Sequence, residues 1–243
     1  SLCASRLSAF VRSMLGVPKV VCILGMHRSG TSCLTGSLQE AGVDLGDCHS
    51  WNPHNRKGNR ENQEIVDLND AVLHSNDAAW DNPRPAIRWS AEHLQEARRL
   101  VTRSTSACFG FKDPRTLLTL KGWAAAVPEL SYIGIFRHPM NVAQSLKNRS
   151  GMPIEDGLDL WYQYNRRLCL HYSLHRFPIL CFDDEESLFK QKLKKVFSKQ
   201  GLYDDSKDSQ FYDSNLRTAE GDAAHRLGWQ ISGLYKILKT IAE

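Results

Sequence analysis

Four short runs of the chain are almost wholly apolar and rich in β-branched or aromatic residues. They lie at residues 19–24, 108–112, 132–136 and 178–182. Apolar runs of this length without alternation are typical of parallel strands that are buried on both faces. Each run is followed by a segment with helix-compatible spacing, which predicts an α/β fold with a mainly parallel central sheet and helices on both faces.

The helices expected after these runs cover residues 31–41, 114–126, an amphipathic segment that begins at Pro139, and 188–200. Further helical spacing occurs at residues 61–74, 157–172 and 226–241, and the second of these segments carries a broad apolar face that indicates core packing. The polar stretches at residues 47–60 and 206–222 have no clear period and are expected to be loops.

Length and composition indicate one domain, because 243 residues with 42% hydrophobic residues can bury a single sizeable core. We expect a short extension over residues 1–18 and one domain over residues 19–243.

The net charge of the chain is mildly positive, at +4. The sequence lacks the clustered basic residues of a nucleic-acid-binding protein, so nucleic acid is not expected as a partner. The sequence has no apolar run of the ~20 residues that span a bilayer and no secretory leader, so a cytoplasmic protein without a transmembrane segment is expected.

Seven cysteines form neither a CxxC pair nor a Cys/His cluster, which predicts free thiols and no metal site. Nothing in the sequence predicts an oligomeric state.

The strongest motif is GMHRSGTS at residues 25–32, directly after the first predicted strand. Gly25 and Gly30 have the spacing of a phosphate-binding loop, but Thr31 stands where a nucleotide triphosphatase has its lysine. The cation of the loop is instead Arg28. Because that lysine reaches the β and γ phosphates, its absence predicts a site for a single phosphate group without a metal.

A second motif, RHPMNVAQS, follows the third predicted strand at residues 137–145. Pro139 favours the first turn of a helix, so Arg137 would end the strand and Ser145 would lie about two turns into the helix. Both side chains could then contact the same anion.

Together the two motifs resemble those of the sulfotransferases that use 3′-phosphoadenosine 5′-phosphosulfate (PAPS), in particular the bacterial-style members with a P-loop-like fold. The resemblance implies PAPS as cofactor, adenosine 3′,5′-bisphosphate (PAP) as product and no required metal. It implies that the 5′-phosphate is bound in the first loop and the 3′-phosphate by the second motif. A looser correspondence places a further arginine near the donor. The residues implied for donor binding are His27, Arg28, Ser29, Gly30, Thr31, Ser32, Arg137, Ser145 and Arg217.

Two carboxylates are alternative candidates for the catalytic base. In membrane-bound relatives a glutamate beyond the donor loop is the base, and Glu61 is the matching residue here. In cytosolic relatives a lysine and a catalytic histidine end a strand; this chain has Lys112 at that point but Asp113 in place of the histidine. Glu61 and Asp113 could also serve only as helix-terminal residues. His54, in the loop before Glu61, is the next candidate.

The resemblance therefore implies transfer of a sulfuryl group to a hydroxyl or amine of a glycan, glycolipid or small-molecule acceptor. Arg28 and Lys112 would stabilise developing negative charge, and Glu61 or Asp113 would take the proton. A P-loop nucleotide or small-molecule kinase and a PAPS- or PAP-binding protein without turnover are the alternatives.

Overall fold

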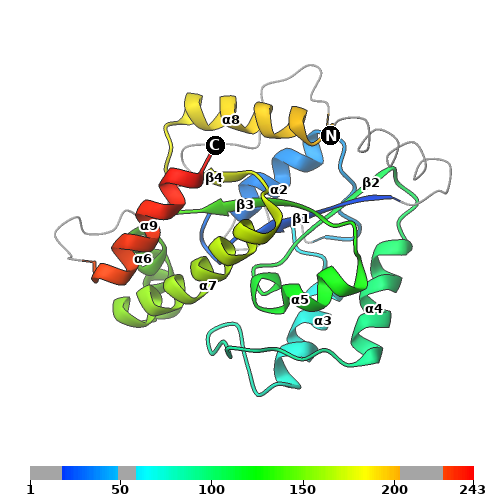
Figure 1. Ribbon diagram of the computed structural model, residues 1–243, viewed down its shortest axis with the longest axis horizontal. Helices are drawn as coiled ribbons and strands as arrows, with labels where there is room; N and C mark the ends of the chain where they lie inside the picture. The colour runs from blue at the N-terminus through cyan, green and yellow to red at the C-terminus, as the bar shows by residue number, and fades with distance from the viewer. Residues whose placement is uncertain (1–17, 49–58, 203–226) are drawn as a thin grey trace.

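The computed structural model describes residues 18–48, 59–202 and 227–243, and in these ranges four parallel strands form one central sheet (Figure 1). The strands are β1 (Lys19–Leu24), β2 (Cys108–Lys112), β3 (Ser131–Phe136) and β4 (Ile179–Cys181), in the spatial order β2-β1-β3-β4. In register, Ile23 of β1 lies beside Lys112 of β2, and Leu24 lies beside Gly134 of β3. The four strands predicted from apolar runs are confirmed.

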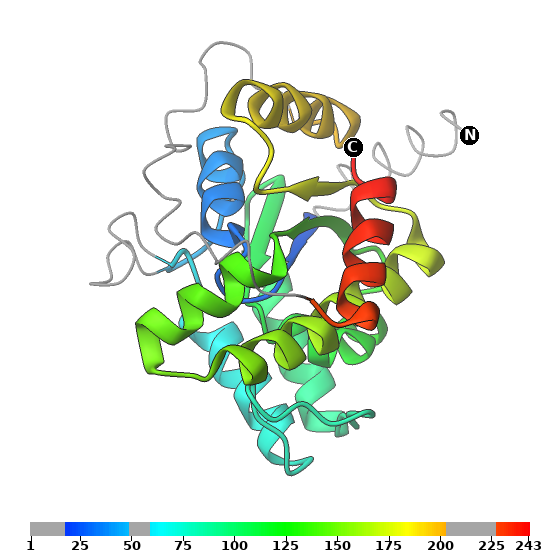
Figure 2. The same cartoon turned by 90° about the vertical axis from the view of Figure 1, so that its left-hand side faces the viewer.

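Helices cover both faces of the sheet, as Figures 1 and 2 show from two directions. One face carries α2 (Thr31–Glu40) and α8 (Glu186–Lys199). The other face carries the remaining described helices: α3 (Gln63–His74), α4 (Ala91–Thr102), α5 (Thr116–Ala126), α6 (Pro139–Ser150), α7 (Ile154–His175) and α9 (Trp229–Ile241). The α/β class with helices on both faces is therefore confirmed.

Two apolar cores fill the spaces above and below the sheet. Val21 and Ile23 of β1 pack toward α2 and α8, whereas Val20, Cys22 and Leu24 pack toward the other layer. This alternation explains why the strand has no polar face: each side chain of the run enters one core or the other.

Several helix boundaries differ from those expected. Asn62 caps α3, so Glu61 lies before the helix, and α5 begins at Thr116 after a turn that includes Pro114. The closing helix begins at Trp229, after Gly228, instead of at residue 226. In each case a cap or turn precedes the first helical residue, and apolar spacing alone does not locate it.

Helix α4 was not predicted. It begins with a capping box in which the Ser90 hydroxyl accepts a bond from the His93 backbone N–H, and His93 bonds back to the Ser90 N–H. Its buried residues are Ala97, Leu100 and Val101. The i, i+3, i+4 spacing of these residues and the serine before the helix were the signals available in the sequence.

A short segment after α2 lies along the outer edge of β2. Asp44 bridges to Phe109, with the Asp44 N–H donating to the Cys108 carbonyl at 3.0 Å and the Gly110 N–H donating to the Asp44 carbonyl at 2.7 Å. These bonds occupy backbone groups that an edge strand otherwise leaves open.

The cysteines at the described positions are free thiols. Within the same ranges, no helix has both the length and the apolar character that crossing a membrane would require.

Candidate functional site

The carboxyl ends of β1, β2 and β3 bring the sequence motifs together at one edge of the sheet. Because β1 lies between β2 and β3, its loop is flanked by Lys112 on one side and Arg137 on the other. The chain passes from β1 to β2 on one side and returns to β3 on the other. Such a topological switch point is where open α/β sheets bind ligands.

The loop after β1 has the backbone of an anion-binding nest. Arg28 has φ 66° and Gly30 has φ 87°, both left-handed, and α2 begins at Thr31 with no side-chain cap. The first helical bond runs from the Leu34 N–H to the Gly30 carbonyl. The N–H groups at the start of α2 have no intrahelical partner, so they and the helix dipole favour a bound phosphate.

Two glycines of the loop are required by sterics. A Cβ at Gly25 would lie 2.7 Å from the Ile135 carbonyl oxygen, and one at Gly30 would lie 2.3 Å from the Phe182 ring. Both distances are far shorter than any real Cβ contact. The glycine spacing therefore reflects close packing of the loop against β3 and the end of β4.

The two donor motifs meet in a direct side-chain contact. Arg28 Nε donates to Ser145 Oγ at 2.7 Å, which joins the β1 loop to α6. Pro139 is the first residue of α6, as predicted, and Ser145 is 3% exposed. Burial lowers the pKa of Arg28, and the positive charges of Arg149 and Arg137 lower it further. Cations are thus concentrated beside the loop, where an anion would relieve their repulsion.

Arg137 is held beside this contact by residues that follow β4. Its Nε lies 3.4 Å from Asp183 Oδ1, and its guanidinium carbon lies 5.6 Å from the centre of the Phe182 ring. Asp183 also accepts bonds from the His138 backbone N–H and from Asn141 Nδ2. Asp183 could not be identified from sequence reasoning, because its position beside Arg137 depends on the pairing of β4 with β3.

On the other side of the loop, Lys112 and Glu61 form a buried ion pair. Lys112 Nζ lies 2.7 Å from Glu61 Oε1 and 3.4 Å from Ser32 Oγ. The Lys112 side chain is 2% exposed and the Glu61 side chain 17% exposed. Ser32 also donates to the Asn59 carbonyl at 3.1 Å. The donor loop, the end of β2 and the segment before α3 therefore converge on one ammonium group.

Asp113 has a different environment, because its carboxylate is enclosed by donors. Oδ1 accepts from the Arg115 backbone N–H at 3.1 Å and from Arg115 Nη1 at 2.9 Å, and Oδ2 accepts from Asn69 Nδ2 at 2.8 Å. The side chain is fully buried. Burial raises the pKa of Asp113 from its ordinary value of 3.8 to about 6, although Arg115 opposes the shift.

His27 is the third residue of the loop. Burial lowers its pKa well below 6.5, and the charges of Arg115 and Lys112 add to this effect. Its ring packs edge-on against Trp80 at 4.8 Å. His27 Nε2 and Ser29 Oγ are both buried without a hydrogen-bond partner among the described residues. A bound polar ligand would satisfy such atoms.

The structure thus places the residues expected for the donor around one strand end, and it brings Glu61 and Lys112 into contact. Asp113 directly follows Lys112 in sequence, but its carboxylate is bonded to Asn69 and Arg115. Arg217 and His54 lie outside the described residues.

Comparison with known proteins finds similar folds among solved structures, and these include two sulfotransferases. The sulfotransferase domain of the olefin synthase from Synechococcus PCC 7002 matches over 91% of this chain and 95% of its own, with a TM-score of 0.57 and 16% identity. The sulfotransferase STF1 from Mycobacterium tuberculosis H37Rv matches over 97% of this chain and 80% of its own, with a TM-score of 0.47 and 13% identity. No family model and no curated protein sequence matches. The chain therefore has the P-loop-like α/β fold of the Synechococcus sulfotransferase domain.

Proposed function

We propose that this protein is a sulfotransferase that transfers a sulfuryl group from PAPS to a hydroxyl or amine of its acceptor. The observation that carries the proposal is the 2.7 Å contact between Arg28 of the first motif and Ser145 of the second. A ligand with two separate phosphate groups on one nucleoside could engage both motifs at once. The likeness in fold to a sulfotransferase domain supports the same choice.

The binding roles follow from the positions of the groups. Backbone N–H groups of residues 28–32 would hold the 5′-phosphate, and Arg137 with Ser145 would hold the 3′-phosphate. Ser29 Oγ and His27 Nε2, buried and unpartnered among the described residues, fit such a ligand. PAPS, when bound, would supply the sulfuryl group.

On the acceptor side, Glu61 is the better candidate for the base. Its carboxylate is partly exposed, whereas that of Asp113 is fully buried and accepts bonds from Asn69 and Arg115. Glu61 would take the proton from the attacking hydroxyl or amine. Lys112 would hold Glu61 in place and, with Arg28, stabilise the negative charge that develops on the bridging oxygen.

Isothermal titration calorimetry with PAP and with ATP tests this proposal most directly. We expect PAP to bind more tightly than ATP, with an affinity that EDTA does not change, because the loop lacks the lysine that reaches a γ-phosphate. Tighter binding of ATP that requires Mg²⁺ would instead favour a kinase. PAP binding without any transfer from PAPS to a panel of sugars, phenols and amines would favour a binding protein.

A further inference from the structure

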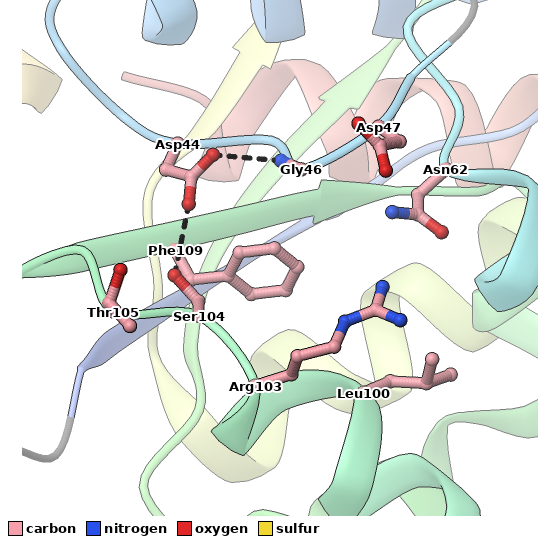
Figure 3. Close-up of a pocket in the computed structure, with 9 residues that line it drawn as sticks. All are labelled: Asp44, Gly46, Asp47, Asn62, Leu100, Arg103, Ser104, Thr105 and Phe109. Atoms are coloured by element: carbon pink, nitrogen blue, oxygen red, sulfur yellow. Dashed lines mark hydrogen bonds between the residues drawn. The ribbon is translucent and has the colours of Figure 1, made fainter.

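A separate pocket of about 390 Å³ opens at the outer edge of β2, between the segment that carries Asp44 to Asp47 and the end of α4 (Figure 3). Phe109 of β2 and Leu100 of α4 form its apolar wall. Its volume lies within the range of small-molecule sites. None of the residues that line it belongs to the donor motifs.

Some polar groups of the pocket are already engaged by the protein. The Asp44 carboxylate accepts from the Gly46 N–H at 2.9 Å and from the hydroxyls of Ser104 and Ser106 at 2.9 and 2.8 Å. The bond from the Gly46 N–H lowers the pKa of Asp44 most, and the bonds from the two serine hydroxyls lower it further, so the carboxylate stays ionised. They fix the shape of the wall.

One polar group at the pocket, the side-chain amide nitrogen of Asn62, has no partner among the described residues. Asn62 is 5% exposed, and its Oδ1 caps α3, but its Nδ2 donates to no described residue. Figure 3 shows this amide nitrogen pointing into the same space as the side chains of Asp47 and Arg103. Gly46 leaves the approach open, since a Cβ there would lie 3.0 Å from Asn62 Nδ2. This amide nitrogen is therefore available to donate to an acceptor of a ligand.

The charges around the pocket argue against an anionic ligand. Asp44 and Asp47 line it, and the guanidinium of Arg103 is bonded to both carboxylate oxygens of Glu64. The two carboxylates that line the pocket outnumber its one lining cation, which Glu64 already pairs with, so a phosphate or carboxylate would be repelled. An ammonium group could not accept a hydrogen bond from the Asn62 amide.

We propose that this pocket binds a neutral sugar ring. Adjacent hydroxyls on such a ring both donate and accept, so one can donate to Asp47 while its neighbour accepts from Asn62. Sugar binding at this place does not depend on the proposed sulfuryl transfer, because no donor group takes part in it.

The test uses the full chain without any donor and records saturation-transfer NMR with methyl β-glucopyranoside as the probe. We expect binding at about millimolar affinity, as is typical of a ligand with few atoms. Thr105 is exposed at the pocket, so Thr105→Phe should fill it and abolish the signal. Thr102→Phe is the matched control, since Thr102 is exposed on α4 and does not line the pocket, and it should keep the signal.

Asp47→Ala provides a second variant at an exposed residue, where no fold defect is expected. It should weaken the sugar about ten-fold or more, because a charge-assisted hydrogen bond is lost. Glucuronate should bind more weakly than the neutral glucoside. The proposal is overturned if the wild-type chain gives no signal, if the signal survives Thr105→Phe, or if glucuronate binds more tightly.

Discussion

At the scale of single residues, Lys112 and Glu61 place opposite charges next to the loop after β1, with the ammonium group buried and the carboxylate partly exposed. A buried ion pair of this kind contributes little net stability, and it becomes costly when one partner is removed. Its value here lies in holding the Glu61 carboxylate at 2.7 Å from a fixed ammonium group. The consequences of changing Glu61 should therefore appear in turnover.

Glu61→Gln keeps an oxygen that can accept from Lys112 but cannot take a proton. We expect kcat to fall by about 10²- to 10⁴-fold with the best acceptor found in the panel, while PAP affinity is unchanged. Glu96→Gln, at an exposed site on α4, is the control and should leave both quantities unaltered. Normal turnover in Glu61→Gln would remove Glu61 as the base.

Arg137→Ala separates the two phosphate sites. The lost charge-assisted bond belongs to a class worth about 1.5–3 kcal/mol, so PAP should bind roughly ten- to a hundred-fold more weakly. Adenosine 5′-phosphosulfate lacks the 3′-phosphate and should be much less affected. Calorimetry with both ligands measures this difference, and Lys147→Ala, which removes an exposed cation of α6, is the control. Equal losses for both ligands would mean that Arg137 acts only through Asp183 and the fold.

The raised pKa of Asp113 predicts a pH dependence of stability. Between pH 3.8 and about pH 6, Asp113 is protonated more in the folded chain than in the unfolded chain. The free energy of unfolding should therefore fall as pH rises through this window. The fall amounts to about 3 kcal/mol at most, since each pKa unit corresponds to about 1.4 kcal/mol. Urea unfolding at pH 4 and pH 6.5 should show this fall in the wild-type chain and not in Asp113→Asn. The same fall in both proteins would contradict the assignment.

At the scale of elements, one buried amide joins α3 to α5. Asn69 donates to Asp113 at 2.8 Å and to Thr116 at 3.2 Å, and its Oδ1 accepts from Thr119 at 2.7 Å and Trp123 at 2.8 Å. This network fixes the start of α5, and therefore the end of β2 that carries Lys112, against the helix that follows Glu61.

Asn69→Ala should cost at least about 2–3 kcal/mol of unfolding free energy, because several buried partners lose their hydrogen bonds at once. Asn148→Ala, on the exposed side of α6, should change it by less than about 0.5 kcal/mol. Urea denaturation compares the two. A small effect of Asn69→Ala would mean that water replaces the amide.

The elements also show what a sequence can and cannot predict. The strands, and the positions of the two motifs at strand ends, were predicted because apolar runs and residue spacing are local properties of the chain. Asp183 beside Arg137 and Asn69 beside Asp113 were not, since each contact joins segments that are distant in sequence. Helix α4 was missed although Ser90 and the spacing of Ala97, Leu100 and Val101 indicated it. The preference for Glu61 over Asp113 as the proposed base rests on the burial and hydrogen-bond partners of the two carboxylates, which residue spacing does not reveal.

At the scale of the whole molecule, donor binding should stabilise the fold, because the loop of β1, the end of β2 and the start of α6 would all contact one ligand. At a concentration one hundred times its Kd, PAP should add about 2.7 kcal/mol to the free energy of unfolding. For a chain of this size, that corresponds to an increase in Tm of about 5–10 °C. Differential scanning calorimetry measures the shift, and the same concentration of adenosine, which has no phosphate, should produce almost none.

The bonds between Asp44 and β2 have a consequence for behaviour at high concentration. Because Asp44 occupies the Cys108 carbonyl and the Gly110 N–H, a second molecule cannot add a strand to this edge. Apart from Lys112, the residues of β2 are apolar and free of proline, a composition that promotes fibril formation when such an edge is open. The segment beside β2 therefore protects the protein against self-association as well as shaping a pocket.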